Sequence, residues 1–269
     1  MKNLLVTICM MLFVNIAGAQ IATFYEVPTG REGVTMNIVL LNPEIPVEKV
    51  LIVVPGTPGS EGRIMIKGVG AARFVFQYTA AYANLFKDAG IALVAMGCPT
   101  DQWNYAQCDD AYRSSKQYVE DTSKVIEQLR SKHGFKDFYL FGHSSGGISS
   151  RWLSLNMPDQ FKGVINSSIM NGTAGTLARS TLSFDMTAIK IPVLNIAHED
   201  DQCRSTPYSI VKRYSKDNLV TVRGGGQSGD VCGGTNRHSF EGRQKGVSQA
   251  IIKWINTGEV QKFVEDDGQ

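Results

Sequence analysis

Short apolar runs rich in β-branched residues alternate with longer helix-like segments along most of the chain, and this alternation constrains the fold more than any other feature. The run Val-Leu-Ile-Val-Val at residues 50–54 is apolar at every position, as expected of a strand buried on both faces. Strands separated by helical segments favour a parallel sheet with helices packed against it. We therefore predict an α/β fold with a mostly parallel central sheet flanked by helices.

The remaining elements follow from the same reading of periodicity and termination signals. The other predicted strands are 23–25, 35–40, 91–96, 137–141, 163–167, 191–197 and 219–223. The predicted helices are 74–87, 112–132, 146–156 and 246–257. The helix at 112–132 is the longest, and its end is marked by a cation and a glycine at Lys132-His133-Gly134.

Composition limits the classes of partner. With 269 residues the chain is long enough to bury a substantial core without a metal. Its 27 Lys and Arg against 25 Asp and Glu give a formal net charge of +2, and no basic run is present. This balance argues against nucleic acid as the main partner. We expect no cofactor.

The N-terminus has the three parts of a secretory signal peptide. Met1-Lys2-Asn3 is positive, residues 4–16 are apolar, and Ala17-Gly18-Ala19 is a small-residue cleavage site. The apolar run is shorter than the about 20 residues that a membrane-spanning helix needs. We therefore expect residues 1–19 to be removed and residues 20–269 to form one secreted or periplasmic domain without membrane insertion.

Four cysteines remain once Cys9 leaves with the signal peptide. In an exported chain they suggest two disulfides, for which three connectivities exist. Cys98–Cys108 with Cys203–Cys232 is the simplest pairing. The absence of any C-x-x-C pair argues against a zinc site.

Residues 142–146 read Gly-His-Ser-Ser-Gly and fit the pattern G-x-S-x-G between a predicted strand and a predicted helix. This is the setting of a nucleophile elbow, which exposes the serine hydroxyl at a sharp turn. The following helix N-terminus favours developing negative charge. We predict Ser144 as the nucleophile. Ser145 is the alternative register, but it lacks the glycine two residues before it.

A serine nucleophile needs a base, and the base needs an orienting carboxylate. In strand–elbow–helix hydrolases the chain order is serine, acid, histidine. Only His238 follows both other members, since the remaining histidines come earlier. The acid is expected just past the predicted strand at 191–197, where Glu199, Asp200 and Asp201 lie. We favour Asp201, with Asp200 as the alternative.

Two further sequence features concern the geometry of the predicted serine, acid and histidine. Cys203 follows Asp201 by two residues and Cys232 precedes His238 by six, so a disulfide between them would hold the acid and base segments together. An oxyanion hole needs two N–H donors. We expect one from Ser145 and one from Thr57, in the loop after residues 50–54.

Over about residues 50–255 the chain resembles the α/β-hydrolase superfamily, in particular small secreted bacterial members of unassigned substrate. The residues that carry the resemblance are Arg113-Ser114-Ser115, Asp121, Leu129, residues 141–147, Asn166-Ser167-Ser168 and residues 198–203. The resemblance implies an α/β-hydrolase fold and a Ser144, Asp201 and His238 triad. Pro55-Gly56 replaces the usual His-Gly, and His198 replaces the usual glycine before the acid motif.

These residues lead to one main hypothesis and two alternatives. The main hypothesis is an exported serine hydrolase of small-molecule carboxylic esters, acting through an acyl-enzyme. Only about 23 residues separate the predicted strands at 163–167 and 191–197, so any cap is small or absent and the cleft is expected to be open. The alternatives are a serine peptidase or amidase on the same elbow, and a non-catalytic binding protein that kept the fold.

Overall fold

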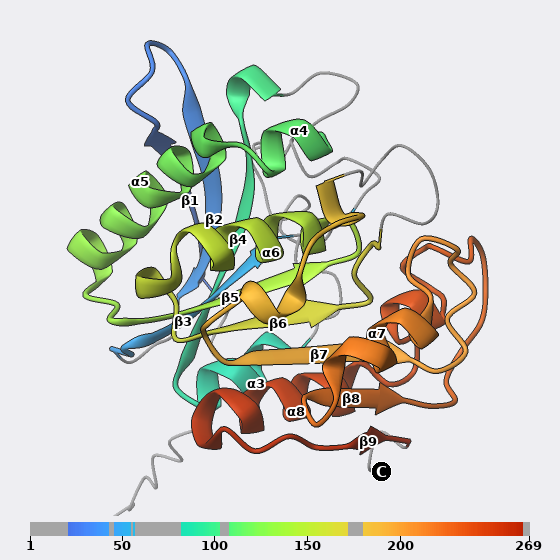
Figure 1. The fold of residues 1–269 in the computed structure, drawn as a ribbon. Coiled ribbons are helices and arrows are strands. Elements are labelled where there is room, and N and C mark those ends of the chain that lie inside the picture. Colours follow the sequence, from blue (N-terminus) through green and yellow to red (C-terminus); the bar gives the residue numbers. More distant parts are fainter. Residues whose placement is uncertain are drawn as a thin grey trace, which may run out of the picture.

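The computed structural model describes residues 21–42, 46–54, 56, 82–102, 108–171 and 180–265. These residues form a nine-stranded sheet in the order β1-β2-β4-β3-β5-β6-β7-β8-β9 (Figure 1). The strands are β1 Ile21–Pro28, β2 Thr35–Asn42, β3 Lys49–Val54, β4 Ile91–Pro99, β5 Asp137–His143, β6 Gly163–Ser167, β7 Val193–His198, β8 Leu219–Val222 and β9 Phe263–Val264. Every neighbouring pair in this order from β4–β3 through β8–β9 is parallel, whereas the pairs β1–β2 and β2–β4 are antiparallel. The predicted mostly parallel sheet is confirmed.

Helices cover both faces of this sheet (Figure 1). They are α3 Ala83–Asp88, α4 Asp110–Arg113, α5 Lys116–His133, α6 Gly146–Asn156, α7 Tyr208–Ser215 and α8 Gln244–Thr257. Buried side chains of α3 and α8 pack on one face of the sheet, and buried side chains of α5 and α6 pack on the other. Within the described ranges, no helix combines the length and the apolarity that crossing a bilayer requires.

Strand β3 shows why its sequence is apolar throughout. Leu51 and Val53 belong to the layer that contains α3 and α8. Val50, Ile52 and Val54 belong to the layer on the opposite face. Because successive side chains of a strand point to opposite faces, both sets are buried and neither face tolerates a polar residue. β3 therefore lies at the centre of the core, between β4 and β5.

The predicted single helix at 112–132 is wrong in one respect, because the structure divides this stretch into α4 and α5. The division falls at Ser114 and Ser115. The Ser115 side chain accepts a hydrogen bond from the backbone N–H of Tyr118 at 3.2 Å and so caps a new helix. Helix α5 then ends as predicted, with Gly134 in the left-handed conformation at φ 70°.

For the other predicted elements, the structure differs from the sequence prediction mainly in where each helix or strand begins and ends. Strand β4 continues three residues beyond the predicted 91–96, and β7 begins after Pro192 and ends at His198. Of the predicted helix at 74–87, residues 74–81 lie outside the described residues, and α3 accounts for the rest. Helix α7 and the short edge strand β9 have no counterpart among the predicted elements.

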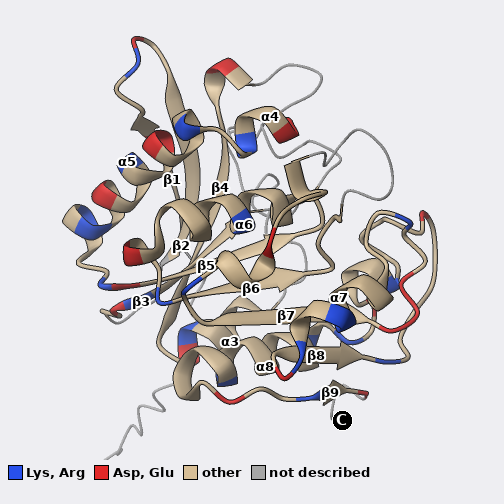
Figure 2. Cartoon of the chain, viewed as in Figure 1, with Lys and Arg blue, Asp and Glu red and all other residues tan. Residues whose placement is uncertain are grey.

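A buried carboxylate joins the N-terminal hairpin to α4 and α5. Asp121, on α5, has a fully buried side chain and pairs with Arg31 from the turn between β1 and β2. Asp121 also accepts a hydrogen bond from the Tyr112 hydroxyl at 2.5 Å and from Gln117 at 3.1 Å. Burial and this carboxylate raise the pKa of Tyr112, so its hydroxyl stays a donor. The outer side of α5 carries both signs of charge (Figure 2).

Removal of this carboxylate should loosen the hairpin. Asp121→Ala leaves the buried Tyr112 hydroxyl without its acceptor and Arg31 without its buried partner, so we expect the free energy of unfolding to fall by about 3 kcal/mol. Chemical denaturation followed by circular dichroism measures this change. The matched control is Glu120→Ala, one residue away on the exposed side of α5, for which we expect a change within about 0.5 kcal/mol. Equal effects of the two substitutions would contradict the structural role of Asp121.

Candidate active site

Ser144 lies at the sharp turn between β5 and α6, and its backbone is in the left-handed region with φ 53°. For a residue other than glycine this conformation costs on the order of 1–3 kcal/mol and persists only where the surroundings hold it. Here the N–H of Ser144 donates to the carbonyl of Ser167 at 3.0 Å. Its carbonyl accepts from the N–H groups of Gly147 and Met170, each at 3.0 Å. The turn is therefore fixed from the neighbouring strand β6 and from its own helix.

Two glycines make room for this turn. A Cβ at Gly142 would come within 2.5 Å of both the Gly146 carbonyl oxygen and the Ser150 Oγ. A Cβ at Gly56 would come within 2.7 Å of the Ser144 Cβ. Both distances are shorter than side chains tolerate, so only glycine lets the chain before and beside the serine pass so closely. Close packing thus explains why the first position of the G-x-S-x-G pattern is a glycine.

Ser145 begins the turn into α6 and is buried. No acceptor within the described part of the chain takes a hydrogen bond from its backbone N–H. This N–H therefore keeps its donor capacity beside the Ser144 hydroxyl, as an oxyanion-hole donor must. Thr57, the second expected donor, lies outside the described residues.

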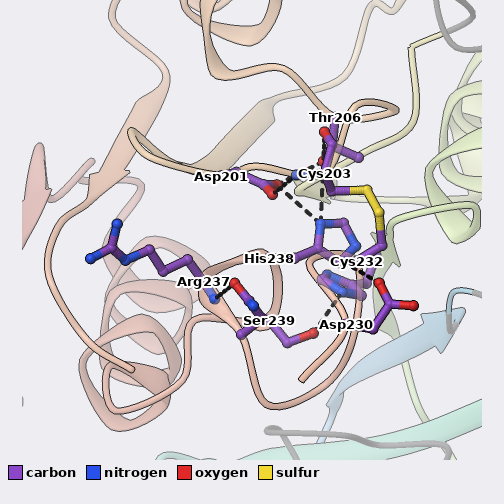
Figure 3. Close-up of a disulfide and its surroundings, with 10 residues drawn as sticks. Asp201, Cys203, Thr206, Asp230, Cys232, Arg237, His238 and Ser239 are labelled. Carbon is purple, nitrogen blue, oxygen red and sulfur yellow. Dashed lines mark hydrogen bonds and ion pairs between the residues drawn. A yellow bond between two sulfur atoms is a disulfide. The ribbon is translucent and has the colours of Figure 1, made fainter. Parts of the chain in front are cut away.

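Asp201 follows the C-terminal end of β7, and its carboxylate contacts His238 (Figure 3). Its Oδ2 lies 3.0 Å from His238 Nδ1, and its Oδ1 accepts the backbone N–H of Cys203 at 2.9 Å. The alternative acids point elsewhere: Asp200 faces Arg237 with a side chain that is 59% exposed, and Glu199 pairs with Arg223. Of the three carboxylates, the structure thus brings Asp201 to the histidine.

His238 lies in a short 3-10 helix, Arg237–Ser239, and its side chain is 1% exposed. Its Nε2 is buried and has no hydrogen-bond partner among the described residues, so Ser144 and His238 are not hydrogen-bonded to each other. The ring of His143, the residue before Ser144, lies 5.0 Å from the His238 ring. Of the three residues predicted from the sequence, Asp201 and His238 are thus in contact beyond the carboxyl end of β7, and Ser144 stands at the carboxyl end of β5 in the same sheet.

Burial disfavours the charged form of the two other buried histidines at this end of the sheet. His143 contacts Ser167 Oγ through Nδ1 at 3.1 Å and Ser239 Oγ through Nε2 at 3.4 Å. Burial, with a contribution from His238, holds the pKa of His143 well below its usual value. Burial likewise lowers the pKa of His198. The Nε2 of His198 lies 2.7 Å from the Gly224 carbonyl, and its Nδ1 accepts the Asp200 N–H at 3.0 Å, so this histidine supports the acid loop.

Two disulfides are present, and their pairing is the one that the sequence favoured. They join Cys98 to Cys108 and Cys203 to Cys232. The second connects the acid segment to the loop that leads to His238 (Figure 3). Cys203 is buried, whereas Cys232 is exposed. The disulfide thus fastens an otherwise exposed loop to the protein interior beside the Asp201–His238 contact.

Sequence reasoning missed two groups that support the site. Thr206, five residues after Asp201, has its hydroxyl 2.7 Å from Asp201 Oδ2 and 3.2 Å from His238 Nδ1. Buried Arg151 on α6 donates to the carbonyl of Met170 and to Asn171 Oδ1, and the Asn171 N–H in turn donates to the carbonyl of Ser205. No spacing rule signals either contact, because each depends on how two loops meet.

The arrangement has the parts needed for acyl transfer: a hydroxyl at a strained turn, an imidazole with an available Nε2, a carboxylate on Nδ1 and a backbone donor. Across the described part of the chain, no three His, Cys, Asp or Glu side chains gather as a metal site would require.

The comparisons with known proteins agree with the fold. A family model described as serine aminopeptidase, S33, matches residues 109–227. No curated protein sequence matches the chain. Among solved structures, the chain is similar to Est1E from Butyrivibrio proteoclasticus, with 16% identity and a TM-score of 0.57 over 87% of this chain and 97% of that one. It is also similar to a dienelactone hydrolase from Anabaena variabilis, with 15% identity and a TM-score of 0.60 over 90% and 99% of the two chains. A third is an alpha-beta serine hydrolase homologue from Coxiella burnetii, with 14% identity and a TM-score of 0.57 over 86% and 95%.

The Cys203–Cys232 disulfide should control how often the segment before His238 opens. In the double variant Cys203→Ser/Cys232→Ser we expect faster backbone hydrogen exchange over residues 226–241, and a loss of about 3–4 kcal/mol in the free energy of unfolding from loop entropy. Hydrogen-exchange mass spectrometry measures the local effect. The control is Cys98→Ser/Cys108→Ser, which should leave exchange in 226–241 close to wild type. An unchanged exchange pattern in the first variant would show that the disulfide does not hold this loop.

Stability should decline in mild acid because of the buried histidines. The folded-state pKa values of His143 and His198 lie below the ordinary value of 6.5. Below that pH the unfolded chain takes up protons that the folded chain does not, so the free energy of unfolding falls as the pH decreases from 6.5 and is fully retained above it. Denaturation at a series of pH values measures the slope. His198→Asn keeps an acceptor for the Asp200 N–H but cannot titrate, so its slope should be shallower; an identical slope would argue against His198 as a contributor.

Proposed function

We propose that this chain, whose fold is similar to that of solved α/β hydrolases, is an exported serine hydrolase that cleaves carboxylic esters through a Ser144, His238 and Asp201 triad. The observation that carries this proposal is the placement of Ser144. Its left-handed turn stands at the same end of the sheet as the buried Asp201–His238 contact. In the elbow of a hydrolase, that placement lets a proton pass from the serine to an oriented imidazole.

The reaction follows from the chemistry of these groups. The Ser144 Oγ attacks the carbonyl carbon of the ester while Nε2 of His238 takes the hydroxyl proton. The carbonyl electrons move to oxygen, which is held by the N–H groups of Ser145 and Thr57. The intermediate then collapses, the alkoxide leaves with the proton from His238, and an acyl-enzyme remains. Water, deprotonated by the same imidazole, releases the acid and restores Ser144.

Asp201 keeps its charge through this cycle and stabilises the imidazolium. Its contact to Nδ1 leaves Nε2 as the nitrogen that exchanges protons. The structure contains no hydrogen bond between Ser144 and His238 within the described residues. Catalytic hydrogen bonds of this kind often tighten only once substrate is bound.

The choice of esters rests on the surroundings of the elbow and on the neighbours. Residues 168–192 link β6 to β7 in one short stretch, so a cap inserted between these two strands would be small, which favours an open cleft for exposed small-molecule esters. Residues 172–179 lie outside the described residues. The similarity to a dienelactone hydrolase also favours ester or lactone substrates. The family model described as serine aminopeptidase instead favours a peptidase on the same elbow, and this is the second candidate.

Export is part of the proposal. Residues 1–20 lie outside the described residues, and the signal peptide rests on their sequence pattern. The two disulfides are compatible with an oxidising compartment outside the cytosol. We propose cleavage after Ala19 and a mature domain of residues 20–269. N-terminal sequencing of the protein recovered from culture medium or periplasm tests this proposal.

A fluorophosphonate probe tests the nucleophile. The wild-type protein should be labelled covalently, and Ser144→Ala should abolish labelling because it removes the attacking oxygen. The control is Ser123→Ala on α5, which removes a serine hydroxyl far from the elbow and should keep full labelling. Ser145→Ala tests the other register. Wild-type labelling in Ser144→Ala would refute the assignment, and a wild-type protein that resists the probe would favour the non-catalytic alternative.

The substrate class is tested on the same protein. We expect turnover of p-nitrophenyl esters with loss of about 10⁴-fold or more in kcat for Ser144→Ala, the scale for removing a triad member. Peptide anilides should be poor substrates in parallel assays. Higher kcat/KM on the anilides than on the esters would replace the esterase proposal with the peptidase one.

A further inference from the structure

The hydroxyl of Thr206 contacts the proposed acid and the proposed base at the same time. It lies 2.7 Å from Asp201 Oδ2 and 3.2 Å from His238 Nδ1 (Figure 3). Thr206 comes from the loop between β7 and α7 and is 1% exposed. These three side chains therefore form a closed, water-excluded junction around the Nδ1 atom.

Counting protons assigns the direction of each hydrogen bond. A threonine hydroxyl has one proton and two lone pairs, and an ionised carboxylate only accepts. The hydroxyl proton belongs on the shorter, charged contact to Asp201 Oδ2, rather than on the Cys203 carbonyl at 3.3 Å. A lone pair of Thr206 Oγ1 then faces Nδ1. A proton on Nδ1 can therefore be shared between two acceptors, the carboxylate and the hydroxyl. An unprotonated Nδ1 would instead place its own lone pair against the lone pairs of these two acceptors.

The loop holds this hydroxyl in place. The N–H of Thr206 donates to the Cys203 carbonyl at 3.0 Å, which closes a tight turn after the acid. The adjacent carbonyl, that of Ser205, accepts the N–H of Asn171 at 2.8 Å and so ties the loop to the end of β6. Cys203 is fixed by its disulfide, and Pro207 restricts the backbone on the other side. The β-branched side chain has few rotamers available in such a turn.

We propose that Thr206 is a positioning residue that locks His238 in the Nδ1–H tautomer, so that Nε2 carries the free lone pair. Its action goes through His238 and Asp201, and its effect on turnover rests on the proposed function. In a buried site the tautomer of a histidine is set by the partner of the other nitrogen. Thr206 supplies the second acceptor for Nδ1–H and, through its own proton, keeps the Asp201 carboxylate turned toward the ring.

The decisive measurement is the tautomer itself, which does not require activity. In ¹⁵N-labelled protein with histidine side-chain NMR, the uncharged form of wild-type His238 should show protonated Nδ1 and bare Nε2. Thr206→Val keeps the β-branched shape and removes the hydroxyl, so we expect a mixture of the two tautomers and faster solvent exchange of the Nδ1 proton. Thr206→Ser restores the hydroxyl and should restore the wild-type signals. Unchanged His238 signals in Thr206→Val would overturn the proposal.

The kinetic consequence is tested on p-nitrophenyl esters. Loss of one hydrogen bond to a charged group predicts a fall in kcat of about ten- to hundredfold in Thr206→Val, with KM nearly unchanged and recovery in Thr206→Ser. A loss of melting temperature without a change of tautomer or kcat would mean that the residue is only structural and would refute the inference. If Thr206→Val does not fold, Thr206→Ala is measured in the same two ways.

Failure of this inference is distinguishable from failure of the proposed function. Loss of probe labelling in Ser144→Ala tests the nucleophile without involving Thr206. Normal labelling and turnover in Thr206→Val, together with an inactive Ser144→Ala, would reject the role of Thr206 and leave the hydrolase proposal intact. A tautomer shift in Thr206→Val in a protein that no probe labels would support the positioning role and reject the hydrolase proposal.

Discussion

The left-handed backbone at Ser144 is the constraint on which the rest of the site depends. A serine with φ 53° is stable only where its neighbours prevent relaxation. Strand β6 opposes relaxation of the Ser144 backbone because it accepts a hydrogen bond from the Ser144 N–H. The glycines at 56 and 142 oppose it because they let the neighbouring chain pack closely against the turn. The order of the sheet, with β3 and β6 on either side of β5, is what brings these partners to the turn. The fold thus stabilises a conformation that the sequence alone disfavours.

The acid and base segments are held by contacts of three different kinds. A disulfide joins Cys203 to Cys232, hydrogen bonds centre on Asp201, and ring contact places His143 beside His238. A further chain of hydrogen bonds runs from buried Arg151 on α6 through Asn171 to the carbonyl of Ser205. Since α6 also begins at the elbow, one helix is connected both to the turn of Ser144 and to the loop of the acid. The two halves of the site are therefore positioned by a common element.

Local sequence patterns were sufficient to predict those parts of the structure that depend on nearby residues in the chain. The apolar run of β3, the strand and helix around Ser144 and the end of α5 at Gly134 are all visible as periodicity or as termination signals. The sequence favoured Asp201 but left Asp200 open, because the choice depends on which side chain a loop turns toward Arg237 and which toward His238. Thr206 was missed for the same reason.

The break between α4 and α5 escaped detection because a capping serine inside a good helical pattern resembles an ordinary surface residue. The position of Thr57 remains a prediction, since it lies outside the described residues. The first and last strands, β1 and β9, are the two margins of the sheet. Neighbouring strands lie about 4.8 Å apart, so these margins are separated by roughly 40 Å. A linker that joins β9 to β1 in a circularly permuted protein would therefore need at least about a dozen extended residues, and shorter linkers would pull a margin strand out of register.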